Sequence, residues 1–359
     1  MGDVNSKRIR MGLGSWTGIF LILLGIFLIS LVSPGDSGEK VKIRVGHFPN
    51  ITHAQAVIDH GLSRKGAGWF EERLGPEYSL EWFTYNAGPS AMEAIFARTV
   101  DFTYVGPNPT VNAYIKSKGE DIRIIAGAAS GGAAFVVQPD GRIKTDADLK
   151  GKKIATPQLG NTQDVAARVY LLSKGYKVTL SGGDVYVIPT QNPDQLALFL
   201  KGEVDGVWTV EPWVTRLLVE GKGVIYLEEK ELWKDGRYVT THLVTSVRFL
   251  KDHRDILKKW IAAHIELTHW ILQNPEEAKK ILNEEIAVET GKPLSPQVLE
   301  GSFARLELTY DPIQDSLVKS AENAFKIGFL GKEKPDLSRI YDLSILNEVL
   351  REKGLPEIP

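Results

Sequence analysis

The chain repeats one pattern of hydrophobic and polar positions, a short apolar run followed by a turn and then a helical period. Residues 102–105 are aromatic or β-branched, which predicts a buried strand, and the Gly, Pro and Asn of residues 106–109 end it. A helical pattern begins at residue 111. This order predicts an α/β fold in which helix N-termini lie at the carboxyl edge of a sheet, where open α/β folds bind ligands.

A segment in the first half of the chain is echoed in the second half. Residues 94–107 read as a helix with a basic end, a tight turn into Val-Asp and a short apolar strand closed by proline, and residues 197–212 repeat that order. Two copies of one α/β unit predict two lobes whose strand ends face each other across a cleft. The alternative is a chance match between short apolar segments.

The same patterns suggest where the chain passes from one lobe to the other. Glycine-rich residues 127–132 suit a hinge, and the β-rich run 240–245 would return to the first lobe as a second hinge strand. Helical patterns fill most of the chain after residue 250 and pack most simply on the first lobe. The expected division is lobe I at 41–130 and 243–359, and lobe II at 131–242.

The first 40 residues carry the pattern of an export signal. Lys7, Arg8 and Arg10 precede an uncharged, strongly apolar run that ends near residue 35. We expect residues 1–40 to be a signal peptide or a signal anchor plus linker, with a hydrophobic helix long enough to cross a bilayer if it is not cleaved. The positive residues would remain in the cytoplasm, so the rest would lie in the periplasm or on the outer face of the cytoplasmic membrane.

Composition excludes several classes of function. The chain has 359 residues, a formal net charge of −2 and no cysteine. It therefore lacks the basic excess typical of a nucleic-acid binder, and it can form no disulfide, thiol nucleophile, cysteine zinc site or iron–sulfur cluster. The sequence contains no nucleophile elbow, Walker loop or dinucleotide fingerprint. We expect a monomer that is not an enzyme and needs no cofactor.

The candidate ligand-binding residues come from the predicted strand-to-helix turns and the hinge strands. These segments are rich in hydroxyls, carboxamides and glycine and mostly lack Arg and Lys, so a ligand held there would meet neutral donors and backbone amides. Such a set suits an oxyanion as well as a neutral polar molecule, although the same residue types are common in ordinary turns. The candidates are His47, Asn50, His53, Asn86, Gly88, Ser90, Asn108, Thr110, Ser130, Gln158, Asn161, Thr162, Glu211, Trp213 and His242.

Histidines in three of these segments leave a metal site open as an alternative. His47, His53 and His242, joined by Glu211, would be a plausible set of ligands for a divalent ion. No tight ligand spacing such as H-E-x-x-H is present, and each histidine can instead form local hydrogen bonds or contact a ligand. We therefore assign no metal ligand from the sequence.

Several stretches of the chain resemble one family of transport proteins. They are Gly-Pro-Asn-Pro at 106–109, Ile-Ile-Ala-Gly-Ala-Ala-Ser-Gly-Gly-Ala-Ala at 124–134, Asp-Leu-Lys-Gly-Lys-Lys-Ile-Ala at 148–155, Pro-Gln-Leu-Gly-Asn-Thr at 157–162 and Val-Asp-Gly-Val-Trp-Thr-Val-Glu-Pro-Trp at 204–213. From about residue 41 to the C-terminus, the chain resembles substrate-binding proteins of ABC importers for aliphatic sulfonates, in the nitrate, sulfonate, taurine and bicarbonate group.

The resemblance implies a type II periplasmic-binding fold, with two α/β lobes joined by two hinge strands. It also implies an extracytoplasmic receptor that delivers a small anionic ligand to a membrane permease and its ATPase. The anion would lie between the helix starts near Ser90, Asn108 and Asn161, with Gln158, Thr162 and Ser130 donating hydrogen bonds and Trp213 covering its apolar part.

The alternatives are a metal or metal-chelate receptor and an enzyme similar to thiamine-pyrimidine synthases, which share the fold. The cysteine-rich iron motif of those enzymes cannot exist in this sequence. The histidines at 47, 53 and 242 depart from what a generic sulfonate site would hold.

Overall fold

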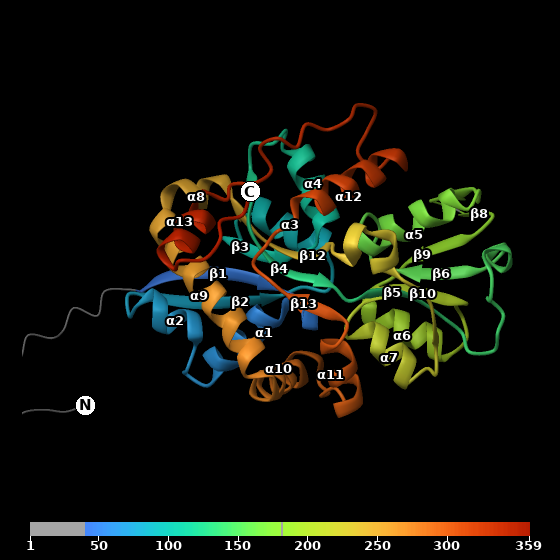
Figure 1. Ribbon diagram of the computed structural model, residues 1–359, viewed down its shortest axis with the longest axis horizontal. Helices are drawn as coiled ribbons and strands as arrows, with labels where there is room; N and C mark the ends of the chain where they lie inside the picture. Colours follow the sequence, from blue (N-terminus) through green and yellow to red (C-terminus); the bar gives the residue numbers. More distant parts are fainter. Residues whose placement is uncertain (1–39, 181) are drawn as a thin grey trace, which may run out of the picture. The chain divides into compact units, whose positions relative to one another are not determined.

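Two large β-sheets organise the chain in the computed structural model, which describes residues 40–180 and 182–359 (Figure 1). Almost all of the expected export segment lies outside the described residues. Among those that are described, no helix is both long and apolar enough to cross a membrane.

The first sheet has six strands in the order β13-β4-β12-β3-β1-β2. Strand β1 pairs in parallel with β2 and β3, while β12 is antiparallel to both β3 and β4. The strands are β1 (Val41–His47), β2 (Tyr78–Thr84), β3 (Phe102–Val105), β4 (Ile122–Gly131), β12 (Val239–Ser246) and β13 (Leu306–Leu308).

Helices contribute to a separate apolar core on each side of this sheet. One core holds buried side chains of α1 (Ala54–Arg64), α2 (Trp69–Leu74), α8 (Val247–Asp252), α9 (Arg254–Gln273), α10 (Pro275–Thr290), α11 (Pro296–Phe303) and α13 (Ser344–Glu352). Within it the Trp260 ring stacks on Phe70 with ring centroids 3.8 Å apart. The other core holds side chains of α3 (Gly88–Phe96), α4 (Pro107–Lys116) and α12 (Gln314–Lys326).

The second sheet has five strands in the order β11-β5-β10-β6-β9. They are β5 (Ala133–Val137), β6 (Lys153–Thr156), β9 (Tyr186–Pro189), β10 (Gly206–Val210) and β11 (Val224–Glu228). Helix α5 (Thr162–Ser173) covers one face, and α6 (Asn192–Leu200) and α7 (Trp213–Val219) cover the other (Figure 1). The short elements are η1 (Ile51–His53), η2 (Asp146–Leu149), η3 (Glu229–Leu232), η4 (Lys234–Gly236) and the ribbon of β7 (Val178–Thr179) and β8 (Gly182–Gly183).

The chain first passes between the sheets at Gly131 and Gly132, whose φ angles are +80° and +77°. Glycine adopts this left-handed conformation without the steric cost that a Cβ would add. The return strand β12 pairs with the first sheet from Val239, opposite Ser130. Residues 239–242, expected in lobe II, therefore pair with the first sheet, because the β12–β4 ladder extends back to the crossing point.

Glu229 is a carboxylate buried in the core of the second sheet. It is fully buried and accepts a 2.7 Å hydrogen bond from the Trp208 Nε1–H. Burial raises the pKa of Glu229 to about 7, because removing the ionised form from water costs more than the hydrogen bond from Trp208 returns.

Replacing Glu229 by glutamine should flatten the pH dependence of stability. The Glu229 carboxyl titrates near pH 4.5 in the unfolded chain and near pH 7 in the folded protein. The contribution of Glu229 to the free energy of unfolding is therefore fully present below pH 4.5 and is lost as the pH rises through about 7. This residue should account for a fall of about 2–3 kcal/mol in the free energy of unfolding between about pH 5 and about pH 8. Urea denaturation at both pH values measures that fall.

The control variant is Glu231→Gln, which removes an exposed carboxylate from the same short helix. This variant should show the same fall in the free energy of unfolding between the two pH values as the parent protein. Equal pH dependence in the two variants would mean that the pKa of Glu229 is not raised when the protein folds.

Candidate ligand-binding site

A small cavity lies between the loops that follow strands of the two sheets. Loops after β1, β2 and β3 reach it from the first sheet, and loops after β6 and β9 reach it from the second. Its volume is about 30 Å³, room for about two water molecules. The residues around it are Phe48, Asn50, Thr52, His53, Asn86, Gly106, Pro157, Asn161, Thr162, Gln163, Asn192, Val210 and Thr240.

Helix N-termini from both sheets converge on this cavity. Gly106 is the N-cap of α4, Asn161 is the N-cap of α5, and Asn192 is the first residue of α6. Asn86 directly precedes Ala87, the N-cap of α3. First-turn N–H groups have no partner within their own helix, and the helix dipole adds positive potential at that end. The cavity is therefore polarised to favour negative charge.

Two buried polar atoms at the cavity have no hydrogen-bond partner among the described residues. They are Thr162 Oγ1 and Asn192 Oδ1, on side chains whose residues are 5% and 7% exposed. An unpaired buried polar atom costs about 1–3 kcal/mol, so a ligand or water that binds either atom recovers part of this energy.

His53 adds a neutral donor. Its Nδ1 accepts a hydrogen bond from the Phe48 N–H at 3.3 Å, and its ring stacks on the Phe48 ring with centroids 4.5 Å apart. Burial, reinforced by the nearby His47, holds the pKa of His53 well below its usual range. The neutral ring must then carry its proton on Nε2, because Nδ1 is an acceptor.

The side chains around the cavity carry no formal charge of either sign. Among the residues that line it there is no Lys, Arg, Asp or Glu. Hydroxyls, carboxamides, His53 and helix N-termini provide the polar contacts, and Phe48, Pro157 and Val210 provide apolar surface. Such a set can hold a small anion or a neutral polar molecule without pairing it with a charged side chain.

Direct contacts between the two sets of loops close the cavity. The Trp213 Nε1–H of α7 donates a 3.0 Å hydrogen bond to Asn50 Oδ1, and both residues are buried. The backbone of Gly106, in the first set of loops, lies close to the Thr162 side chain in the second set. A Cβ added to Gly106 would lie 2.7 Å from Thr162 Oγ1, so glycine permits the two loops to approach this closely. A ligand larger than the cavity can enter only if these contacts open.

The structure brings together part of the set of residues expected from the sequence. Asn50, His53, Asn86, Asn161 and Thr162 line the cavity. Trp213 does not line the cavity itself, but it donates a hydrogen bond to Asn50, which does. Gly88 lies beside another lining residue, since a Cβ added to it would be 3.3 Å from Asn161 Oδ1.

Three of the expected residues have their side chains bound elsewhere. The His47 Nε2 lies 3.0 Å from Glu289 Oε1, and the His242 Nε2–H donates to the Pro312 carbonyl at 3.0 Å. Glu211 accepts hydrogen bonds from Thr215 and Ser302 and forms a 3.0 Å ion pair with Arg305. The four-residue metal set considered from the sequence is therefore not assembled, because these partners hold its members apart.

The remaining expected residues have local roles. The Thr110 hydroxyl donates to the Gly106 carbonyl at 2.9 Å, and the Asn108 carboxamide exchanges hydrogen bonds with Ser320. Ser130 lines a different hollow, Gln158 is exposed, and Ser90 is half-buried in the first turn of α3.

Sequence reasoning did not single out several residues of the lining. Phe48, Thr52, Gly106 and Gln163 belong to turns that were expected at the cleft, and Pro157 directly precedes one of these turns, but none was named as a ligand-binding residue. Asn192, Val210 and Thr240 were also missed. The Asn-Pro pair at 192–193, directly after a strand pattern, is a helix-start signal that could have identified Asn192.

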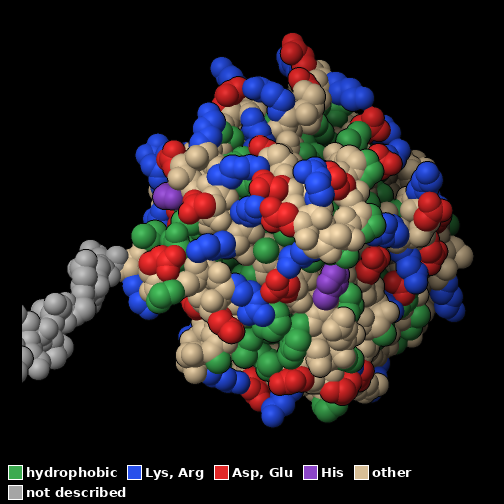
Figure 2. Space-filling model, turned by 60° about the vertical axis from the view of Figure 1, so that its left-hand side comes forward, with side chains coloured by type: hydrophobic (Ala, Val, Ile, Leu, Met, Phe, Trp, Pro, Cys, Tyr) green, Lys and Arg blue, Asp and Glu red, His purple; other side chains and the backbone are tan. Residues whose placement is uncertain are grey.

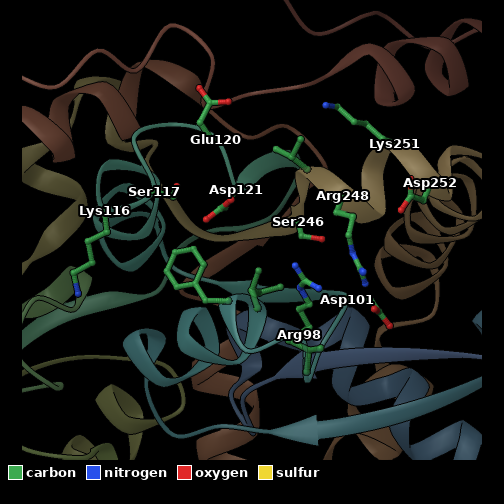
Figure 3. Close-up of a pocket in the computed structure, with 14 residues that line it drawn as sticks. Arg98, Asp101, Lys116, Ser117, Glu120, Asp121, Ser246, Arg248, Lys251 and Asp252 are labelled. Atoms are coloured by element: carbon green, nitrogen blue, oxygen red, sulfur yellow. The ribbon is translucent and has the colours of Figure 1, made fainter.

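A larger hollow of about 660 Å³ lies at the other edge of the first sheet (Figure 3). It adjoins Asp101, directly before β3, whereas ligands of α/β folds bind beyond the carboxyl ends of strands. Its labelled side chains mix basic residues such as Arg98 and Arg248 with acidic residues such as Asp121. Charges are similarly mixed over the face drawn in Figure 2, so neither surface presents a field of one sign.

Replacing Thr162 by valine should not reduce the stability of the ligand-free protein. The change removes a hydroxyl that has no partner and keeps the side-chain volume, so the free energy of unfolding should stay unchanged or rise by about 1 kcal/mol. Thr110→Val is the matched control, because it removes a paired hydroxyl and should cost about 1 kcal/mol. Denaturant unfolding of both variants measures the contrast, and equal losses would contradict an unpaired Thr162.

Comparison with known proteins places this chain in a family. The model of the NMT1-like family matches residues 36–285. A protein of Brucella abortus (strain 2308), named only as a candidate binding protein, is 26% identical over 247 residues, which are 68% of this chain and 71% of that protein. The taurine-binding periplasmic protein of Escherichia coli (strain K12) is 23% identical over 198 residues, 55% of this chain and 59% of that protein.

A solved structure shows the same fold. The alkanesulfonate-binding protein SsuA from Xanthomonas axonopodis pv. citri, bound to MOPS, superposes with a TM-score of 0.68 and 20% identity, covering 84% of this chain and 99% of that one. The expected two-lobe binding-protein fold is confirmed for the described residues. With the family model spanning more than half of its length, the chain belongs to the NMT1-like family.

Proposed function

We propose that this protein is the extracytoplasmic solute-binding component of an ABC importer and captures a small aliphatic sulfonate or related oxyanion. The observation that carries the proposal is the buried cavity between the carboxyl ends of two sheets, where helix N-termini converge and no lining side chain is charged. An anion there accepts hydrogen bonds from backbone N–H groups that otherwise lack acceptors.

Neutral donors complete the anion site. The Thr162 hydroxyl and the His53 Nε2–H can each donate to an oxyanion, and the Asn161 carboxamide lies beside them at the start of α5. Hydrogen bonds to a charged acceptor are roughly twice as strong as those between neutral groups, and they strengthen further when water is excluded.

The lining also favours one type of sulfonate over another. Phe48, Pro157 and Val210 offer apolar surface to a short alkyl chain. Taurine carries an ammonium group as well, and no Asp or Glu in the lining is available to pair with it. A buried ammonium without a carboxylate partner is costly, so a sulfonate whose alkyl chain carries no charged group should bind more tightly than taurine.

Capture requires the two halves to move apart. A cavity of about 30 Å³ is too small for an alkanesulfonate, so entry must break the Trp213–Asn50 hydrogen bond and open the cleft. The glycines at 131 and 132 lie at one crossing between the sheets and can change conformation there. In an open form the helix N-termini would be hydrated, and closure around the anion would remove that water.

Related proteins support the same role. The names of the relatives describe binding proteins for taurine and alkanesulfonates. A binding role also suits the lining, where no carboxylate or lysine is present to act as general acid, base or nucleophile, and where the Nδ1 lone pair of His53 already accepts the Phe48 N–H. We infer delivery of the bound ligand to a membrane permease and its ATPase, at the periplasm or the outer face of the cytoplasmic membrane.

A panel of ligands tests the proposal by calorimetry and thermal shift. Methanesulfonate, ethanesulfonate, taurine, nitrate and bicarbonate are titrated into the purified protein and into Thr162→Val. The true ligand should stabilise the protein by about 4 kcal/mol at roughly 1,000 times its Kd. An alkanesulfonate should bind more tightly than taurine, and Thr162→Val should weaken its binding by about tenfold.

Thr110→Val serves as the control for binding. Thr110 does not line the cavity, so loss of its hydroxyl should leave the affinity for the ligand unchanged. The proposal fails if none of the anions binds, or if binding is equal in the parent protein and Thr162→Val.

A further inference from the structure

Three side chains converge at a second place in the first sheet, away from the cavity lining. They are His47 at the end of β1, His60 on α1 and Glu289 on α10. The His47 Nε2 lies 2.9 Å from His60 Nδ1 and 3.0 Å from Glu289 Oε1, and the last two atoms are 2.8 Å apart. Among the described residues, this is the one group of three metal-ligating side chains whose donor atoms lie close enough to share an ion.

When both rings are neutral, their protons do not account for all three contacts. The His47 Nδ1 lies 3.2 Å from the Phe48 carbonyl, so its proton is used there and Nε2 presents a lone pair to the cluster. His60 Nδ1 can supply at most one proton to its two neighbours. With both rings neutral, the 3.0 Å contact between His47 Nε2 and the Glu289 carboxylate brings two lone pairs face to face, and either a second proton on His47 or a shared metal ion resolves it.

Glu289 carries a further unpaired atom. Its side chain is 2% exposed, and its Oε2 has no hydrogen-bond partner within the part of the chain that the structure describes. A buried carboxylate normally accepts hydrogen bonds on both oxygens, or else coordinates a metal. The second oxygen is therefore free to ligate an ion through the same carboxylate.

The spacing of the three atoms suits a transition-metal ion. Ligands at about 2.1 Å from an ion lie about 3.0 Å apart at right angles and about 3.4 Å apart in a tetrahedron. The observed edges of 2.8–3.0 Å match three adjacent positions of an octahedral ion. Two imidazoles and one carboxylate are typical ligands of Zn²⁺, Co²⁺, Ni²⁺ and Fe²⁺, whereas Mg²⁺ and Ca²⁺ prefer oxygen.

Neighbouring groups orient these ligands. The Trp82 ring stacks on His60 with centroids 5.4 Å apart and meets His47 edge-on at 5.5 Å. Glu285 lies 3.3 Å from His60 Nδ1, but it also accepts a 2.8 Å hydrogen bond from Arg64, so its charge is already compensated. The two rings and Glu289 are therefore the ligands, and Glu285 supports them.

We propose that His47, His60 and Glu289 bind one divalent first-row transition-metal ion. The ion would tie α10 to α1 and to the end of β1, which are more than 200 residues earlier in the sequence. His47 directly precedes the segment containing Phe48, Asn50 and His53, so the bound ion would also brace one wall of the cavity. The site stands on its own geometry and does not depend on which ligand the cavity takes.

Metal binding to the chelator-treated full chain tests this proposal. Zn²⁺, Co²⁺ and Ni²⁺ are each offered in equilibrium dialysis, the bound metal is measured by elemental analysis, and the Co²⁺ complex is examined by visible absorption. We expect one equivalent of metal and a ligand-field spectrum of cobalt bound to nitrogen and oxygen. His60→Gln and Glu289→Gln should each weaken binding by at least about tenfold.

Matched controls separate this site from chance binding. Glu284→Gln removes an exposed carboxylate of the same helix, and His269→Gln removes a histidine outside the cluster, so both should bind metal like the parent protein. Circular dichroism shows that each variant is folded. Less than one equivalent of metal in the folded parent protein, or equal affinity in the cluster variants and the controls, would overturn the proposal.

Discussion

The candidate site depends on one arrangement: several helices from both sheets begin at a small cavity that no charged side chain lines. Helices α4, α5 and α6 begin at residues of the cavity lining, and α3 begins directly after another. Neither lysine nor arginine lines this space. We propose that an anion meets the favourable end of each helix dipole, so that the helix starts, more than any charged side chain, select the ligand.

The same arrangement explains why some conspicuous polar residues lie outside the site. Glu211 links the start of α7 to Ser302 on α11 and to Arg305, directly before β13, and burial raises its pKa to about 7. Its side chain is therefore bound to residues of α11 and of the approach to β13, and it does not line the cavity. His47 is likewise turned away from the cavity towards α10, where it supports the wall from behind.

The sequence was sufficient for the features that short-range patterns determine. Strand, turn and helix order predicted the two-sheet fold, and capping residues such as Asn161 and cleft residues such as His53 were identified. Side-chain direction was less predictable, because it is set by distant partners: His47 meets Glu289, which is 242 residues later in the chain. The β-rich run 240–245 was placed within one residue of each end of β12, Val239–Ser246, because its local propensity is strong.

The central claim is that a buried anion is held by backbone amides and neutral side chains alone. A crystal structure of the complex with methanesulfonate, or with the tightest ligand of the panel, tests this most directly. We predict sulfonate oxygens within about 3.2 Å of backbone N–H groups at the starts of α4, α5 or α6 and of the Thr162 hydroxyl. An arginine or lysine side chain paired with the sulfonate, or an anion seated in the hollow beside Asp101, would contradict the account.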